Sequence, residues 1–304
     1  KEKLIEMKDK MKSLYDTLNY LPKKCASFKT ISCFGNIMKD FYIIYESDDW
    51  HNAMLYSFGF NGYIDNLIGV KENMMNKKLN DVTYTKRNKF KFYDLHHPAI
   101  KNNPIKNNID LKKSIILTGP NAAGKTTMLK ATIINLLFSQ QIGLGFFKKC
   151  ILNPYDFIHC YINIPDDCSR DSLFQSEVRR CKVFLDLIKK NPDKRHFCVF
   201  DELFSGTNPY EAISSAYSYL NHIVKNKKIR FLLTTHFIRL CKLFRKHKKI
   251  ENFNMNTTIE NDKAFYTYKM IKGISHTKGG ISVLKDLDYP ETILKDARKV
   301  LSEL

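Results

Sequence analysis

The chain has 304 residues, 43% of them hydrophobic, which is enough for the core of one large domain or of two. Its 50 Lys and Arg residues against 31 Asp and Glu leave a formal net charge of +19, which favours polyanionic partners such as DNA or RNA. No apolar run approaches the roughly 18–20 residues that a membrane span needs, so we expect a soluble chain without a membrane partner.

A helical segment is expected over residues 1–88. An apolar stripe predicts a first helix that ends at Pro22; its members are Leu4, Met7, Met11, Leu14, Leu18 and Leu21. The apolar pattern predicts a second helix over about residues 48–78. The chain opens at Lys1 rather than at an initiator methionine, which is compatible with a piece of a longer protein.

From about Lys89 the pattern changes to short strand-like runs that alternate with helices. The runs are "FKFYDLHHPAI", "SIILTG", "FIHCYINI", "HFCVF" and "RFLLTTH". This alternation predicts an α/β domain over residues 89–304 with a mostly parallel central sheet. The tail, residues 279–304, reads as two helices divided at Tyr289–Pro290. We therefore expect an α/β fold, preceded by an all-helical segment and closed by a helix-turn-helix.

One loop carries a phosphate-binding pattern between a predicted strand and a predicted helix. Gly119-x-x-x-x-Gly124-Lys125-Thr126 fits the Walker A spacing, in which small residues let backbone N–H groups close around phosphate oxygens. Lys125 is expected to reach the β- and γ-phosphates, and Thr126 to place its hydroxyl on Mg²⁺. The predicted ATP-binding residues are Gly119, Pro120, Asn121, Ala122, Ala123, Gly124, Lys125, Thr126 and Thr127.

Two further strand ends carry groups that suit hydrolysis. Asp201 and Glu202 follow the apolar run "HFCVF", at the edge where open α/β sheets bind ligands. Asp201 is expected to share the Mg²⁺ ion with Thr126, and Glu202 to act as the general base for water. His236 ends the run "FLLTTH" and is expected to sense the γ-phosphate, although such a histidine is more often a structural hydrogen-bonder. Together these groups indicate an ABC-type ATPase that uses ATP and Mg²⁺.

Several motifs resemble those of the MutS family, and they occur in the family's order over about residues 90–304. "TGPNAAGKTTMLK" is similar to the family's T-G-P-N-x-x-G-K-[ST]-T loop, and "HHPAI" to the R-H-P-x-[VL] strand before it. "SLFQSEV" resembles the S-T-F-x-x-E-[ML] helix start, while "DELFSGTNPYEA" and "LLTTHFIRL" resemble the two later motifs. The helices before residue 89 would then correspond to the end of the family's core and lever region.

The resemblance implies further site residues and a dimer. By position, Asn121 would orient the attacking water or sense the γ-phosphate. Ser172 would cap the γ-phosphate of ATP bound to a partner subunit, which suits a serine at a helix N-terminus. Each composite site would then need two chains, in a homodimer or a MutS-like heterodimer whose contact includes residues 279–304.

Three positions depart from the family pattern. Where the family usually has an aromatic residue that stacks on adenine, "KNNPIKNN" has only Pro104 and Ile105. Ser205 replaces the usual arginine before Gly-Thr, and alanine stands at position 122 or 123 in place of methionine or glycine. None of these changes removes a catalytic group.

The expected function is an intracellular ATPase, in the cytoplasm or the nucleus, that dimerises and couples ATP turnover to binding of double-stranded DNA, including mismatched DNA, in mismatch repair. One alternative is a MutS-related ATPase of recombination or general nucleic-acid handling, and another is a nucleotide-gated structural dimer. A transporter subunit is disfavoured because no L-S-G-G-Q motif precedes "HFCVFDE". An alternative to nucleic-acid binding as the explanation of the net charge is that a Lys-rich composition spreads solvated charge over every face.

Overall fold

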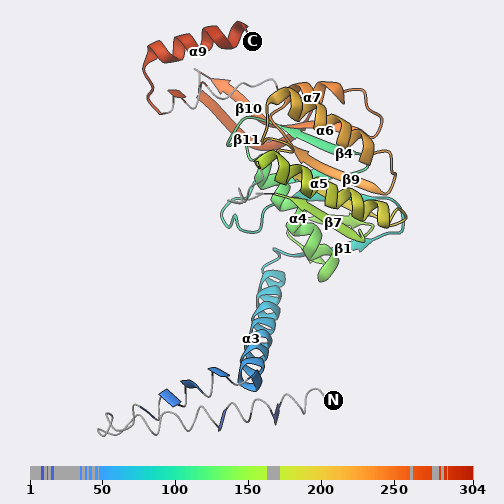
Figure 1. Ribbon diagram of the computed structural model, residues 1–304, viewed down its shortest axis with the longest axis vertical. Coiled ribbons are helices and arrows are strands. Elements are labelled where there is room, and N and C mark those ends of the chain that lie inside the picture. Colours follow the sequence, from blue (N-terminus) through green and yellow to red (C-terminus); the bar gives the residue numbers. More distant parts are fainter. Residues whose placement is uncertain are drawn as a thin grey trace. The chain divides into compact units, whose positions relative to one another are not determined.

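The computed structural model describes residues 48–162, 172–260, 263–275 and 287–303, together with single positions between 8 and 46 and at 281, 284 and 285. The chain divides into two compact units, Lys1–Lys77 and Lys78–Leu304, and Figure 1 shows their elements. Within the described residues, no helix has the length and apolar character that a membrane crossing requires. The apolar stripe from Leu4 to Leu21 lies outside the described residues.

The first unit contains α3 (Asp48–Met75), a helix of 28 residues in the range where a helix is expected. Helical geometry ends beyond Met75, where Lys77 takes a left-handed φ of 54°. The expected helical segment reached residue 88, but residues 80–84 form a strand, β1 (Asn80–Tyr84). Its Val-Thr-Tyr run suits a strand, and it pairs in parallel with β6 (Lys149–Leu152). The helical prediction is therefore wrong for these five residues.

The central sheet of the second unit has the strand order β11-β10-β4-β9-β8-β7. Its strands are β4 (Ser114–Thr118), β7 (Phe157–Tyr161), β8 (His196–Asp201), β9 (Ile229–Thr234), β10 (Ile250–Glu260) and β11 (Lys263–Lys272). Every neighbouring pair is parallel except β10 and β11, which form an antiparallel hairpin. The predicted α/β class and mostly parallel sheet are confirmed.

A second, smaller sheet has the order β3-β2-β6-β1-β5 and is mainly antiparallel. Besides β1 and β6 it contains β2 (Phe90–Leu95), β3 (Asn107–Asp110) and the two-residue β5 (Leu144–Gly145). Its buried side chains, Phe90 and Phe92 among them, join the same core as the helix that follows β4. The second sheet therefore closes one side of that helix.

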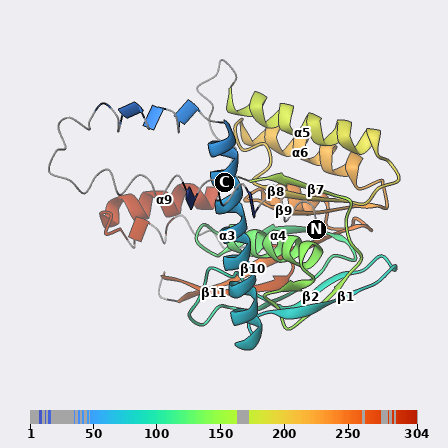
Figure 2. The same cartoon turned by 90° about the horizontal axis from the view of Figure 1, so that it is seen from below.

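Helices cover both faces of the central sheet, because successive side chains along each central strand point to opposite faces. Ile115 and Leu117 of β4 face a core shared with α4 (Lys125–Gln141) and the smaller sheet. Ile116 faces the opposite core, where Phe200 of β8 packs with α5 (Leu173–Lys190), α6 (Pro209–Ile223) and α7 (Ile238–Leu243). Figure 2 shows α4 on one side of β8 and β9, with α5 and α6 on the other.

The tail contains α9 (Glu291–Glu303), which begins directly after Pro290. Arg298 and Glu291 form an ion pair across it, with Nη1 and Oε1 3.1 Å apart. Most of residues 276–286 lie outside the described residues, so the first helix of the expected helix-turn-helix stays a prediction.

Candidate functional site

The phosphate-type loop connects the buried strand β4 to α4. Ala123 N donates to Pro120 O at 3.4 Å, which closes a turn, and α4 then begins at Lys125. Gly124 has a φ of 91°, and a Cβ there would lie 3.1 Å from Tyr268 Cδ1, so both backbone and space require glycine. The loop therefore presents backbone N–H groups at a helix N-terminus, which is a favourable arrangement for anions.

Lys125 is the first residue of α4 and is buried, although it is a lysine. Its Nζ donates to Pro120 O at 3.1 Å and lies 3.0 Å from Nε2 of His236. Burial lowers the pKa of the Lys125 ammonium, and the nearby carboxylates Glu202 and Asp201 oppose that shift. A cation that is partly desolvated and has no fixed ion pair of its own in the described structure is well placed to take a phosphate oxygen.

The two carboxylates stand at the end of β8, beside the ends of β9 and β4. Strand register pairs Asp201 with Thr234 of β9, and Leu117 of β4 pairs with the same threonine. Asp201 Oδ1 accepts hydrogen bonds from the hydroxyls of Thr234 and of Thr126, the latter at 3.2 Å. The parallel register therefore brings the predicted metal-binding pair, Asp201 and Thr126, into direct contact.

Glu202 and Lys125 compete for one nitrogen of His236. Glu202 Oε1 lies 2.9 Å from His236 Nε2, and this hydrogen bond lowers the pKa of the Glu202 carboxyl. A protonated Nε2 can donate to the carboxylate, whereas only a bare Nε2 can accept from the Lys125 ammonium. The tautomer of His236 therefore decides which of the two groups Nε2 can contact.

The oxygen donors present fit Mg²⁺ better than a metal that needs many protein ligands. Among the described residues, no three or more His, Cys, Asp or Glu side chains form a metal-type cluster. The Thr126 hydroxyl and the Asp201 carboxylate are two hard oxygen donors, 3.2 Å apart, beside the loop. Mg²⁺ commonly takes one or two protein oxygens and completes its shell with water and phosphate oxygens.

Three of the remaining predicted residues are exposed and lie apart from the hydrogen bonds around Lys125. Asn121 and Thr127 are exposed, on the loop and on the first turn of α4. Ser172 is the exposed N-cap of α5, where its Oγ accepts from Gln175 N at 3.3 Å and Gln175 Oε1 accepts from Ser172 N at 3.0 Å. In the described part of one chain, no hydrogen bond joins Ser172 to Lys125 or Glu202.

Glu177 is a buried residue whose role the sequence does not predict, although it is the glutamate of the "SLFQSEV" motif. Its Oε1 accepts from Ser205 N at 3.1 Å and from Ser205 Oγ at 3.3 Å, and its Oε2 accepts from Gly206 N at 3.1 Å. A Cβ on Gly206 would lie 2.8 Å from Leu173 Cγ. The loop after Glu202 is therefore held against the N-terminus of α5, next to Ser172.

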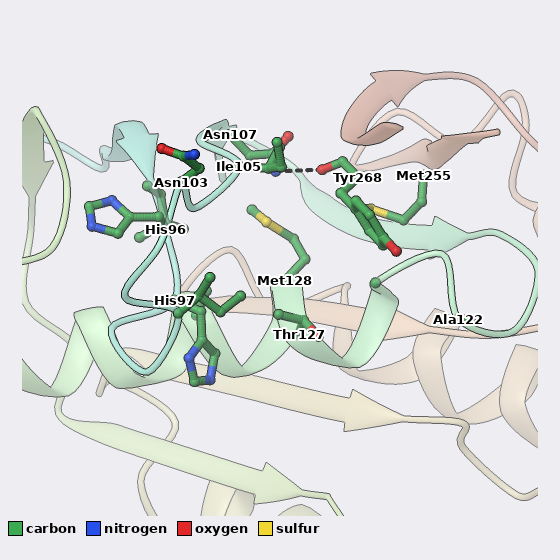
Figure 3. Close-up of a pocket in the computed structure, with 14 residues that line it drawn as sticks. His96, His97, Asn103, Ile105, Asn107, Ala122, Thr127, Met128, Met255 and Tyr268 are labelled. Atoms are coloured by element: carbon green, nitrogen blue, oxygen red, sulfur yellow. Dashed lines mark hydrogen bonds between the residues drawn. The ribbon is translucent and has the colours of Figure 1, made fainter. Parts of the chain in front are cut away.

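A pocket of about 300 Å³ lies beside the loop. Figure 3 shows Tyr268 and Met255 on one side, His96 and His97 on the other, and side chains of α4 between them. Tyr268 is the one Phe, Tyr or Trp side chain among the described residues that line this pocket, and it comes from β11 rather than from the segment after the His-Pro motif. The sequence does not predict this role, because Tyr268 lies about 160 residues beyond the segment where the family has its aromatic residue.

A β-bulge sets the position of Tyr268. Met255 pairs with Met270 and Thr257 with Tyr266, so one residue of β10 faces residues 267–269 of β11. Tyr268 takes a left-handed φ of 54°. The buried Asn107 of β3 secures the bulge: its Nδ2 donates to Tyr268 O at 3.0 Å, and its Oδ1 accepts from Met270 N at 2.8 Å. Figure 3 shows the first of these bonds.

Comparison with known proteins identifies the family of the chain. Residues 115–304, more than half of the chain, match the family model for MutS domain V. The chain is 30% identical over 198 residues to the DNA mismatch repair protein MutS of Phocaeicola vulgatus, covering 64% of this chain and 22% of that protein. It is 31% identical over 193 residues to the protein of the same name from Orientia tsutsugamushi, with 62% and 21% covered.

A third relative, the DNA mismatch repair protein MutS of Persephonella marina, is 28% identical over 213 residues, which is 68% of this chain and 24% of that protein. The aligned part of the chain thus spans between a fifth and a quarter of the length of these curated relatives. The family match covers residues 115–118 of β4, the loop after it and the ends of β8 and β9, so it includes the whole cluster around Lys125. The chain therefore belongs to the MutS family.

Proposed function

We propose that this chain is the Mg²⁺-dependent ATPase part of a MutS-type protein that acts inside the cell in DNA mismatch repair. One observation carries the ATPase proposal: Lys125 Nζ and Glu202 Oε1 lie 3.0 and 2.9 Å from the same atom, His236 Nε2. Mismatch repair itself rests on the relatives, which are named as DNA mismatch repair proteins.

On the phosphate side, each group has a role that its chemistry supports. The N–H groups of the loop and the Lys125 ammonium bind the β- and γ-phosphates. Thr126 and Asp201 would hold Mg²⁺, which would neutralise phosphate charge. Asn121, exposed on the loop, contacts the γ-phosphate or the attacking water. Positioning and charge neutralisation are the main contributions that an enzyme makes to phosphoryl transfer.

For hydrolysis, Glu202 accepts the proton of the attacking water as that oxygen bonds to the γ-phosphorus and the bond to the ADP oxygen breaks. Its lowered pKa keeps the carboxylate ionised, which a base requires. His236 orients it through the 2.9 Å hydrogen bond. When phosphate draws the Lys125 ammonium away from Nε2, a proton on that nitrogen serves Glu202 without competition.

The base of the nucleotide would enter the 300 Å³ pocket, where Tyr268 offers the ring that the segment around Pro104 and Ile105 does not. Aromatic rings stack on any base, since each base has a π-face. Ile105 and Met128, which also line the pocket, supply apolar contacts on the remaining sides. The sequence departure at Pro104–Ile105 is thereby compensated from β11.

The site is proposed to be completed by a second chain. Ser172 is exposed at the N-terminus of α5, where its hydroxyl and the helix dipole suit a γ-phosphate bound to a partner subunit. We propose that the ABC-type ATPase domain expected over residues 89–304 also includes β1, and that its helix-turn-helix tail at 279–304 packs the dimer. Residues 1–77 would transmit the nucleotide state outward, to double-stranded DNA bound by the homodimer or heterodimer.

The proposal is tested by Lys125→Ala. Loss of the cation is expected to abolish ATP binding in isothermal titration calorimetry, because the loop N–H groups alone do not neutralise the β- and γ-phosphates. Lys148→Ala, at an exposed lysine of the same domain, is the matched control and should bind as the wild type does. Unchanged ATP affinity in a folded Lys125→Ala variant would refute the assignment.

A further inference from the structure

Outside the nucleotide site, a strongly basic cleft of about 580 Å³ lies where α7 meets the start of β10. We call it the basic cleft, and its cations are Lys113, Lys242, Arg245, Lys246, Lys248 and Lys272. They come from segments far apart in the sequence: the residue before β4, the last turn of α7 with the turn that follows it, and the end of β11. The fold therefore gathers this charge.

The charge in the basic cleft is largely uncompensated. Of the residues that line it in the described structure, Glu251 is the one acid, and it already pairs with Lys272 at 2.7 Å. No ion pair joins the other five cations to a residue in the described part of the chain. Elsewhere exposed lysines do have acidic partners, such as Lys182 with Asp186 and Lys228 with Asp193.

The cations are held by ordered backbone. Phe244 and Ile250, both buried, anchor the two ends of the turn that carries Lys246 and Lys248. Within it, Phe244 N donates to Leu240 O at 3.3 Å and His247 N to Phe244 O at 3.0 Å. Like charges fixed in one place repel each other and strengthen the local positive potential. If the lysines served only to solvate the surface, the fold would not need to bring cations from three distant segments together.

We propose that the basic cleft binds the phosphate backbone of double-stranded DNA. Five unpaired cations on a fixed surface match a polymer that carries one negative charge per about 1.7 Å of its axis. A second copy of this chain is a poor occupant, because its own formal charge is +19. The identification of duplex DNA as the ligand rests on the proposed function. The charge and the geometry of the cleft are independent of it.

The basic cleft also lies on the strand that borders the nucleotide pocket. Asn252 and Asn254 of β10 line the cleft, whereas Met255 lines the pocket, because alternate residues face opposite sides of the strand. Ser275 N donates to Thr118 Oγ1 at 3.0 Å, and Thr118 directly precedes the loop that begins at Gly119. DNA in the cleft would therefore contact an element shared with the ATP site.

The test compares two triple variants of the full chain with equal charge change. The cleft variant carries Lys242→Gln, Arg245→Gln and Lys246→Gln. The control carries Lys149→Gln, Lys189→Gln and Lys190→Gln, at exposed lysines outside the cleft. Fluorescence anisotropy with a labelled duplex DNA, over a series of KCl concentrations, measures affinity and its salt dependence.

The cleft variant should bind at least about tenfold more weakly, and its slope of log K against log salt should fall by about 0.9 per lost phosphate contact. The control variant should stay close to wild type. Equal losses in both variants would overturn the proposal, as would the absence of wild-type binding at low salt. Competition by poly-glutamate as strong as that by unlabelled duplex, at equal charge, would overturn it too, since it would identify an acidic protein as the ligand.

Failure of the ATPase proposal would be visible separately. Without nucleotide, Lys125→Ala should bind the duplex as the wild type does, because Lys125 is buried and does not line the cleft. The cleft variant should in turn keep its ATP affinity. Loss of ATP binding in the cleft variant would overturn the separate-site proposal.

Discussion

The phosphate side and the base side of the nucleotide pocket are built in different ways. On the phosphate side, Lys125, Asp201 and His236 follow the ends of parallel strands whose register fixes their spacing. On the base side, Tyr268 stands on a bulge of an antiparallel hairpin and is held by one buried side chain, Asn107. The first arrangement depends on the whole sheet, the second on two hydrogen bonds.

The difference concerns what each side is proposed to do. Transition-state charge must be met by groups placed to within a fraction of an ångström, so rigid strand ends suit the phosphate side. Stacking on a base tolerates displacement, since it depends on overlap of flat surfaces. Loss of the general base Glu202 on the phosphate side should therefore affect hydrolysis far more than binding, and changes on the base side should mainly affect binding.

The largest effect is expected for Glu202→Gln. Glutamine keeps the shape of glutamate but cannot take a proton from water, so single-turnover ATP hydrolysis should slow by about 10²–10⁴. Lys125, Thr126 and Asp201 are unchanged, so ATP affinity should stay near wild type. The variant should also accumulate as an ATP-bound dimer in size-exclusion chromatography with Mg-ATP, because an intact γ-phosphate would stay bound between Lys125 of one chain and Ser172 of the other.

Glu72→Gln, at an exposed glutamate of α3, is the matched control and should hydrolyse ATP at the wild-type rate. If Glu202→Gln also hydrolyses at that rate, Glu202 is not the base. If it instead loses ATP affinity, the carboxylate acts in binding, and the contrast between the two sides of the pocket fails.

The phosphate side could be predicted from sequence because its signals are local and contiguous. A strand buried on both faces, such as β4 or β8, is a continuous apolar run, and its polar residues follow directly at its end. The parallel order of β4, β8 and β9 then brings those ends together. This explains why five predicted residues, Lys125, Thr126, Asp201, Glu202 and His236, form one connected cluster.

The base side and the smaller sheet lacked such signals. Strand β5 has two residues and β3 has four, too few for a visible alternation. Tyr268 reaches the pocket through a bulge, and a one-residue change of pairing reverses which face a side chain occupies. The bonds of Asn107 span 161 and 163 residues of sequence, so no local pattern indicates them.

A smaller effect is expected for Tyr268→Ala. Removing the ring should weaken ATP binding by about 1–3 kcal/mol, the usual contribution of a base–aromatic stack, while single-turnover hydrolysis at saturating ATP stays close to wild type. Calorimetric titration with ATP measures the loss. Tyr268→Phe is the matched control, because it keeps the ring and removes only the hydroxyl. Equal weakening by both substitutions would show that the hydroxyl, rather than stacking, binds the nucleotide.

The smallest effect on nucleotide binding is expected for Asn107→Ala, which acts only through the bulge. The substitution leaves Tyr268 O and Met270 N without the bonds at 3.0 and 2.8 Å, so the unfolding free energy should fall by about 1–3 kcal/mol. The ring remains but is less well held, so ATP affinity should fall by less than in Tyr268→Ala. A purely structural role would lower stability without changing ATP affinity.

The double variant separates a structural role from a positioning role. If Asn107 positions the ring, then Asn107→Ala should weaken ATP binding in the wild type but not in the Tyr268→Ala background. Additive losses of affinity would mean that Asn107 affects the pocket by another route.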